Sequence, residues 1–136
     1  LLIYQQIPHE AAELIMRSRR EGLWLRDLEE QELGFDHAEV GGALLEAWGL
    51  PAVLVEAVRY HLQPDKASEE FQKSAYLVHL AHEIHHHHLD RDPALEEGAD
   101  VDPALFEKLE IPVDALDKMI EQARSHYEDA RTMIMG

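Results

Sequence analysis

The sequence contains no cysteine among its 136 residues. Disulfide scaffolds, cysteine-ligated zinc sites, thiol catalysis and iron–sulfur clusters are therefore excluded. Basic residues are also scarce, because 12 Lys and Arg stand against 28 Asp and Glu, a formal net charge of −16 with neutral histidines. A nucleic-acid interface needs clustered Lys and Arg, and the cluster formed by Arg17, Arg19 and Arg20 is too small to reverse this balance. We therefore expect no nucleic-acid partner.

Long apolar runs are missing as well. No run approaches the roughly 20 residues that a membrane span requires, and the start of the chain shows no signal-peptide pattern. We therefore expect no membrane partner, and the lack of cysteine fits a cytoplasmic location. Hydrophobic residues make up 46% and charged residues 29% of the chain, a balance typical of globular proteins. A chain of this length can bury a hydrophobic core, so we expect one domain over residues 1–136.

Almost every segment has a helical pattern, with Pro and Gly at the boundaries. The only candidate strand is the apolar run at residues 1–4. The sequence therefore predicts an all-α fold, a compact multi-helix bundle with a helical core at 1–89, an acidic loop at 90–102 and C-terminal helices at 103–136. The expected helices are 8–22, 25–33, 37–48, 51–61, 69–88, 103–109 and 112–135.

Two adjacent glycines stand inside the third expected helix. Each costs about 1 kcal/mol of helix stability relative to alanine, which indicates a packing requirement. Gly41 lies one turn after His37, so another backbone could approach closely there. His61 lies at the end of the next helix, on its apolar stripe, and the two histidines could meet. They could be core histidines with satisfied hydrogen bonds or metal ligands.

Four motifs in this order and spacing resemble one family. They are Gly-Phe-Asp-His-Ala-Glu-Val-Gly at 34–41, Trp-Gly-Leu-Pro at 48–51, Tyr-His at 60–61 and Leu-Val-His-Leu-Ala at 77–81. Together they closely resemble the HDOD domain, a bacterial signalling domain related to the HD phosphohydrolases. The resemblance covers about residues 2–82 and weakens toward the C-terminus. It implies a helical bundle of the HD-domain type.

The resemblance also implies a partly eroded metal site. HD enzymes hold metal through an early His, a His-Asp pair, and later His and Asp residues. The His-Asp helix would precede Leu1, so we expect the chain to be the C-terminal half of the domain. His37 matches the His of the Asp-His motif in HD-GYP phosphodiesterases. Tyr60-His61 stands where those enzymes carry a His-His pair. His82 stands where a later Asp is expected, so His37, His61 and His82 would form at most a vestigial site.

These departures favour a non-catalytic module for bacterial signal transduction, with no catalytic residue. It would act through protein partners or attached signalling domains, and a divalent metal ion is its one candidate cofactor. His37, Gly41, Trp48, Pro51 and His61 would organise the former active-site face. The alternative is a metal-dependent HD-type phosphohydrolase of a nucleotide or cyclic dinucleotide, in which the three histidines above would join upstream ligands.

A second group of histidines ends in four consecutive ones. His82, Glu83 and His86 formally match His-Glu-x-x-His, the zinc helix of metalloproteases. A peptidase would also need a third ligand and an edge strand for its substrate, and an all-α chain offers no such strand. We expect adventitious binding of nickel or zinc by His82, His85, His86 and His88, because their spacing places imidazoles side by side. Metal storage or sensing is the alternative.

The last expected helix carries an apolar stripe at alternating steps of three and four residues. This spacing is a heptad seam about three repeats long. Packing against the rest of the protein is one interpretation, and a homodimer or signal-transmitting seam through the helix 112–135 is the other. The stripe consists of Val113, Leu116, Ile120, Ala123, Tyr127, Ala130 and Ile134.

Overall fold

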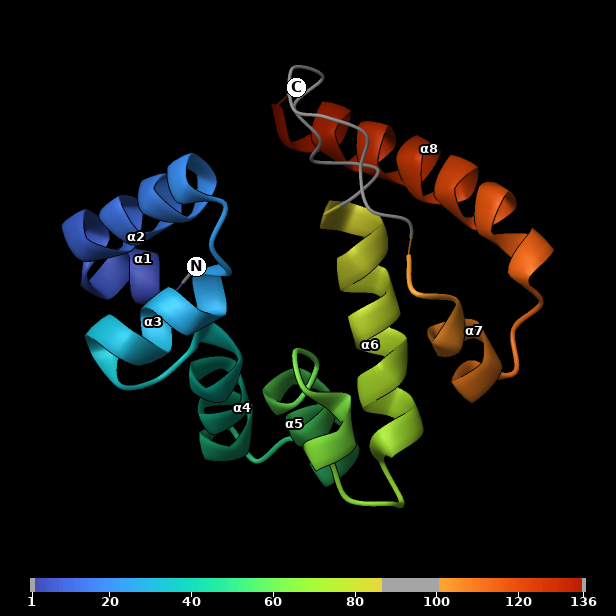
Figure 1. Ribbon diagram of the computed structural model, residues 1–136, viewed down its shortest axis with the longest axis horizontal. Helices are drawn as coiled ribbons and strands as arrows, with labels where there is room; N and C mark the ends of the chain where they lie inside the picture. Colours follow the sequence, from blue (N-terminus) through green and yellow to red (C-terminus); the bar gives the residue numbers. More distant parts are fainter. Residues whose placement is uncertain (1, 87–100, 136) are drawn as a thin grey trace. The chain divides into compact units, whose positions relative to one another are not determined.

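The computed structural model describes residues 2–86 and 101–135, and every regular element within these ranges is helical (Figure 1). The all-α prediction is therefore confirmed. Each of the described helices is too short or too polar to cross a membrane. In chain order the elements are α1 Leu2–Gln6, α2 Pro8–Glu21, α3 Leu25–Leu33, α4 His37–Ala47, α5 Ala52–Arg59, the 3₁₀ turn η1 Pro64–Lys66, α6 Gln72–Ile84, α7 Pro103–Leu109, the 3₁₀ turn η3 Val113–Ala115 and α8 Leu116–Met135.

Several predicted elements and boundaries differ from the structure. The strand considered at residues 1–4 is absent, because α1 makes residues 2–6 helical. The helix expected from residue 69 begins only at Gln72. Ser68, which directly precedes the expected start, donates its hydroxyl and its backbone N–H to the carboxylate of Glu56, at 2.8 and 2.7 Å. The expected end of that helix at 87–88 and the acidic loop at 90–102, apart from its last two residues, lie outside the described residues.

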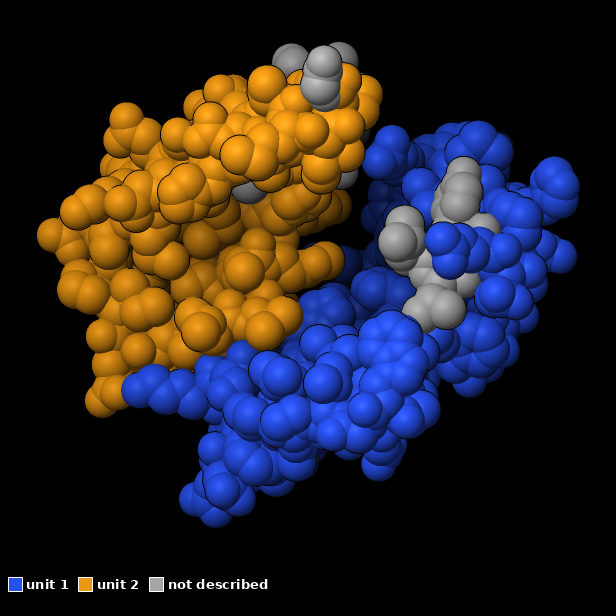
Figure 2. All heavy atoms as spheres, turned by 180° about the vertical axis from the view of Figure 1, so that it is seen from behind, with its two compact units in different colours: residues 1–75 blue, residues 76–136 orange. Residues whose placement is uncertain are grey.

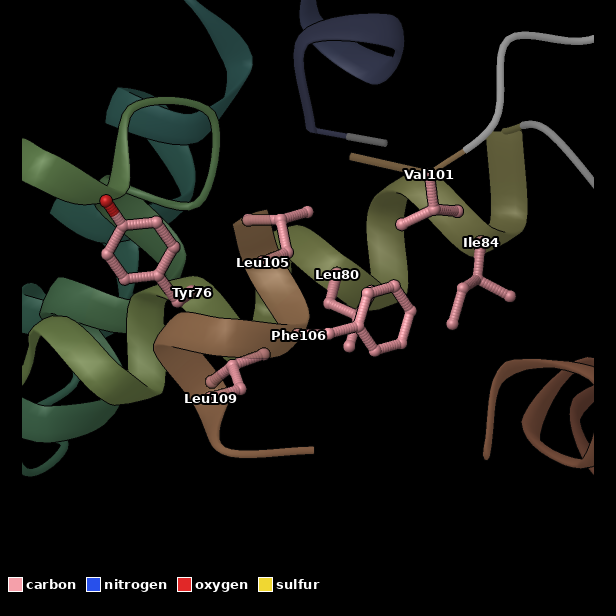
Figure 3. Packing of buried hydrophobic residues seen from close by; sticks show 7 residues of the cluster. All are labelled: Tyr76, Leu80, Ile84, Val101, Leu105, Phe106 and Leu109. Carbon is pink, nitrogen blue, oxygen red and sulfur yellow. The ribbon is translucent and has the colours of Figure 1, made fainter. Parts of the chain in front are cut away.

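The chain divides into two compact units, Leu1–Ala75 and Tyr76–Gly136 (Figure 2). The second unit has a continuous hydrophobic core (Figure 3). Its members come from α6 and α7, together with Val101, which lies two residues before α7. Phe106 and Leu80 are its largest fully buried side chains. Ile111, Leu116, Met119 and Ile120 cover the core, so the start of the heptad stripe packs within its own unit. The core consists of Tyr76, Leu80, Ile84, Val101, Leu105, Phe106 and Leu109.

In the first unit, α4 and α5 approach each other closely at the paired glycines. A Cβ built on Gly42 would lie 2.5 Å from the Cβ and 3.1 Å from the Cα of Arg59. One built on Gly41 would lie 2.9 Å from Cγ1 of Val58, which is a single side-chain methyl group. Gly41 therefore faces the neighbouring helix as predicted, but Gly42 makes the tighter approach.

Replacement of Gly42 by alanine should destabilise the first unit. The new methyl group would overlap the Arg59 backbone region, and such overpacking costs about 1–3 kcal/mol, against a gain of about 1 kcal/mol in helix propensity. Because the overlap reaches the Cβ and Cα of Arg59, the cost lies in the upper part of this range. We therefore expect a net loss of about 1–2 kcal/mol in the free energy of unfolding, measured by urea denaturation followed by circular dichroism. Gly41→Ala is the matched control and should cost less, because its methyl group would meet one side-chain methyl of Val58 and no backbone atom. Equal stability of the Gly42→Ala and wild-type proteins would contradict the close approach.

Candidate functional site

The junction between α3 and α4 is held in one conformation by local chemistry. Gly34 ends α3 with φ of 81°, in the left-handed region that glycine adopts without strain. Asp36 then caps α4, since its Oδ1 accepts the backbone N–H of Glu39 at 2.8 Å. The Glu39 side chain accepts the backbone N–H of Asp36 at 3.1 Å, which completes a capping box. The start of α4, and with it His37, is therefore fixed.

A cation from α3 compensates the buried carboxylate of Asp36. Asp36 is only 6% exposed, and its Oδ2 accepts the Nε–H of Arg26 at 3.1 Å. Arg26 also donates from Nη2 to Oε2 of Glu30 at 3.0 Å. A buried charge is tolerated only when it is paired and hydrogen-bonded, and this pair ties the cap of α4 to α3.

A second buried carboxylate, Glu29 of α3, holds His37. Glu29 is 5% exposed, and its Oε2 accepts the backbone N–H of His37 at 3.0 Å and lies 2.6 Å from the ring Nδ1. An ionised carboxylate can only accept, so Nδ1 of His37 is the donor. The lone pair of the neutral ring is then on Nε2.

His61 is oriented in a similar way, two residues after α5 ends. Its Nδ1 lies 2.6 Å from the carbonyl oxygen of Val58, and a carbonyl can only accept, so Nδ1 again donates. The rings of His37 and His61 have centroids 5.9 Å apart and are tilted by 58°. The expectation that these two histidines meet is confirmed.

This pair has the hydrogen bonds of metal-ligating histidines but not a complete set of ligands. A ligating His commonly donates its second N–H to a carboxylate or a backbone carbonyl, as His37 and His61 both do. Residues 2–86 and 101–135 nevertheless bring together no group of three or more His, Cys, Asp or Glu side chains able to hold a metal ion. His82, the third predicted ligand, belongs to the second unit. The described residues alone therefore do not complete a site of the HD type.

A small polar pocket is lined by the chain neighbours of both histidines. Asp36 and Tyr60 contribute to its wall, together with Arg26, Arg59 and Lys66. Its volume is about 60 Å³, well below the roughly 300 Å³ and more of typical small-molecule sites. It has room for a few water molecules or a small ion, but not for a nucleotide.

Arg59 reaches this pocket from the crossing of α4 and α5. Its Nη2 donates to Oε2 of Glu46 at 2.7 Å, and this hydrogen bond raises the pKa of the Arg59 guanidinium. The cation is therefore permanently charged and tied to α4. Its charge is already shared with a carboxylate, which leaves less of it to attract a ligand.

The remaining motif residues lie along α4 and the turn that follows it. Gly41 faces Val58 across the helix crossing. Trp48 follows the last residue of α4 and is 67% exposed. Pro51 precedes α5, where its fixed φ of −56° suits a helix start. Trp48 thus presents its indole to solvent.

The other histidines lie at the end of α6, in the second unit. His82 and His86 stack with parallel rings whose centroids are 6.3 Å apart. His85 instead meets Tyr127 of α8 edge-on, with ring centroids 6.2 Å apart. The predicted cluster therefore contains a stacked pair and one histidine with a different neighbour.

Sequence reasoning missed Glu29, which is the residue that orients His37. A signal for it exists in the pattern of α3, because Glu29 lies one turn after Leu25 and next to Leu28, on the apolar stripe of that helix. A carboxylate on an apolar stripe indicates a buried partner. Arg26 and Arg59 were also missed, and no short motif marks them.

Removal of the Glu29 carboxylate should destabilise the protein and release the ring of His37. Glu29→Ala leaves two donors of His37 without their acceptor, and we expect a loss of about 1–3 kcal/mol in the free energy of unfolding. In wild-type protein, ¹⁵N NMR should show the His37 proton on Nδ1, and the variant should show a shift toward the other tautomer. Glu32→Ala is the control on the same helix, since its exposed ion pair with Arg17 contributes little. An unchanged tautomer in Glu29→Ala would contradict this role.

Comparison with known proteins identifies one family. Residues 1–64 match the family model of the HDOD domain. No curated protein and no solved structure matches the chain. The match lies in the N-terminal part of the chain, so the expectation that the chain is the C-terminal half of the domain is not borne out. The match includes the Asp-His, Trp-Gly-Leu-Pro and Tyr-His motifs, so residues 1–64 are similar to the HDOD domain.

Proposed function

We propose that this protein is a non-catalytic module of bacterial signal transduction, located in the cytoplasm, that acts through protein–protein contacts. The observation that carries the proposal is that Nδ1 of both histidines and the carboxylates beside them are hydrogen-bonded within the protein. Glu29 and the Val58 carbonyl hold the two rings, and Arg26 neutralises Asp36. The neighbouring pocket of about 60 Å³ is too small for a nucleotide substrate.

The family match supports the same proposal. HDOD domains are HD-related domains associated with signalling, and residues 1–64 match their family model. Two departures from the HD-GYP pattern also support the proposal. Tyr60 stands in place of one histidine of the His-His pair, so one metal ligand that hydrolysis would need is missing there. Leu62 to Pro64 replace the Gly-Tyr-Pro signature region.

An exposed apolar surface on the first unit supports a role in protein contacts. Trp48 and Leu50 lie in the connection from α4 to α5 and Leu54 lies in the first turn of α5, with exposed fractions of 67%, 39% and 48%. Aromatic residues are enriched in protein interfaces, and tryptophan is prominent among the residues that dominate binding energy. We call Trp48, Leu50 and Leu54 the turn surface.

The second half of the α8 stripe offers another contact surface. Leu116 and Ile120 cover the core of their own unit, whereas Tyr127 is 46% and Ile134 is 83% exposed. A homodimer through the helix 112–135 stays a prediction for this exposed half.

A metal-dependent HD-type phosphohydrolase is the second candidate. The observation in its favour is that both imidazoles of the pair donate from Nδ1, which directs the lone pair of each neutral ring to Nε2. The described residues supply two such donors and no third. We therefore derive no hydrolytic step.

Metal content distinguishes the two candidates. We expect protein bearing the full native N-terminus and no affinity tag to retain no stoichiometric metal at His37 after chelator dialysis, measured by mass spectrometry. His37→Ala should show the same metal content as wild type, and neither should hydrolyse nucleotides or cyclic dinucleotides with added Mn²⁺. Stoichiometric metal that survives dialysis and drops in His37→Ala would overturn the non-catalytic proposal.

Substitution of Trp48 tests the protein contacts. Trp48→Ser removes the largest side chain of the turn surface, and its stability cost should be within about 1 kcal/mol because the indole is mostly exposed. Proteins that copurify from cells with the wild type should be recovered at least tenfold less with the variant, by quantitative mass spectrometry. Trp24→Ser is a matched control, since Trp24 is 62% exposed elsewhere in the same unit. Equal recovery with both variants would count against the turn surface.

A further inference from the structure

We propose that the C-terminal end of α6 binds a borderline divalent transition-metal ion through the paired imidazoles of His82 and His86. This site is separate from the His37–His61 pair and lies outside the HDOD match at residues 1–64. The inference does not depend on the proposed signalling function.

The geometry of the pair carries the inference. His82 and His86 are one helical turn apart, and their rings are parallel, with an interplanar angle of 0° and centroids 6.3 Å apart. Both rings therefore extend from the same side of α6. Side chains four residues apart on a helix are neighbours, so rotation of the side chains can bring one nitrogen of each ring to a shared ion without a change in the backbone fold.

The backbone at this point is also unusual. Residues 85 and 86 continue α6 as a π-type turn. Such turns are rare and occur frequently at functional sites.

The neighbouring histidine does not belong to this pair. His85 meets the ring of Tyr127 at 6.2 Å between centroids, with an interplanar angle of 75°. Its imidazole is therefore engaged with α8 rather than stacked on His82 or His86. The difference makes a defined two-histidine site distinguishable from general binding by a histidine-rich surface.

The donor set selects the class of ion. Imidazole nitrogen suits Cu²⁺, Ni²⁺ and Zn²⁺, whereas Mg²⁺ and Ca²⁺ prefer oxygen ligands. Within the described ranges no third His, Asp or Glu completes a cluster, so water would fill the other coordination positions. We expect affinity to follow the usual order for divalent ions, with Cu²⁺ bound more tightly than Ni²⁺ or Zn²⁺. The net charge of −16 favours cations generally, so specificity must be tested at the residue level.

The test is a titration of the full chain with Ni²⁺ alone, and then with Cu²⁺, by isothermal calorimetry. All proteins carry His87→Gln and His88→Gln, so that the adjacent histidines do not contribute. In this background His82→Gln and His86→Gln should each weaken binding at least tenfold. His85→Gln is the matched control and should change the affinity less than twofold.

Three results would overturn the proposal. The background protein could fail to bind Ni²⁺ and Cu²⁺, or the three single variants could lose affinity equally, which would show an adventitious ion only. Mg²⁺ could also compete at a concentration similar to that of Ni²⁺, which would show a general charge effect. Circular dichroism of each variant verifies that α6 is intact, and the imidazole ¹⁵N resonances of His82 and His86, but not of His85, should change first on addition of metal.

Discussion

The close approach of α4 and α5 at Gly42 is the constraint on which the candidate site depends. No side chain larger than hydrogen fits there, because a Cβ would lie 2.5 Å from the Cβ of Arg59. His37 begins one of these helices and His61 follows the other, so the crossing brings their rings to 5.9 Å. The same contact places Arg59 where its guanidinium reaches Glu46. The paired glycines weaken α4 as an isolated helix and determine where the polar side chains around it can meet.

The polar side chains near this crossing satisfy one another. Glu29 and Asp36 are both buried carboxylates, and burial of a charge is unfavourable unless it is fully hydrogen-bonded. Glu29 accepts two donors of His37, and Asp36 accepts from Arg26 and from the backbone of α4. These bonds fix the position of His37 and engage its Nδ1 in a hydrogen bond with Glu29. A network of this kind stabilises a particular arrangement of helices, which suits a module that presents a surface to partners.

The sequence predicted what local chemistry determines and missed what tertiary contacts determine. The bounds of α3 and α7 follow from Gly and Pro at fixed positions, and the structure confirms them. The start of α6 was wrong because Ser68, a good local cap, bonds instead to Glu56, twelve residues earlier. Local propensity gives no indication of such a partner. The Glu29–His37 contact was also missed because it is a tertiary contact, although the two residues lie on consecutive helices.

The contact between His37 and Glu29 changes what the Asp-His motif implies. A histidine at this position resembles a metal ligand of the HD enzymes, but here it also has a structural role. Its loss would leave the buried carboxylate of Glu29 without its two donors, an arrangement that is costly whether or not a metal ever binds. The buried Glu29 of α3 therefore requires this imidazole independently of catalysis. A match at His37 alone is thus evidence for the fold, whereas a claim of hydrolysis needs the other ligands, of which the described residues bring only His61 near it.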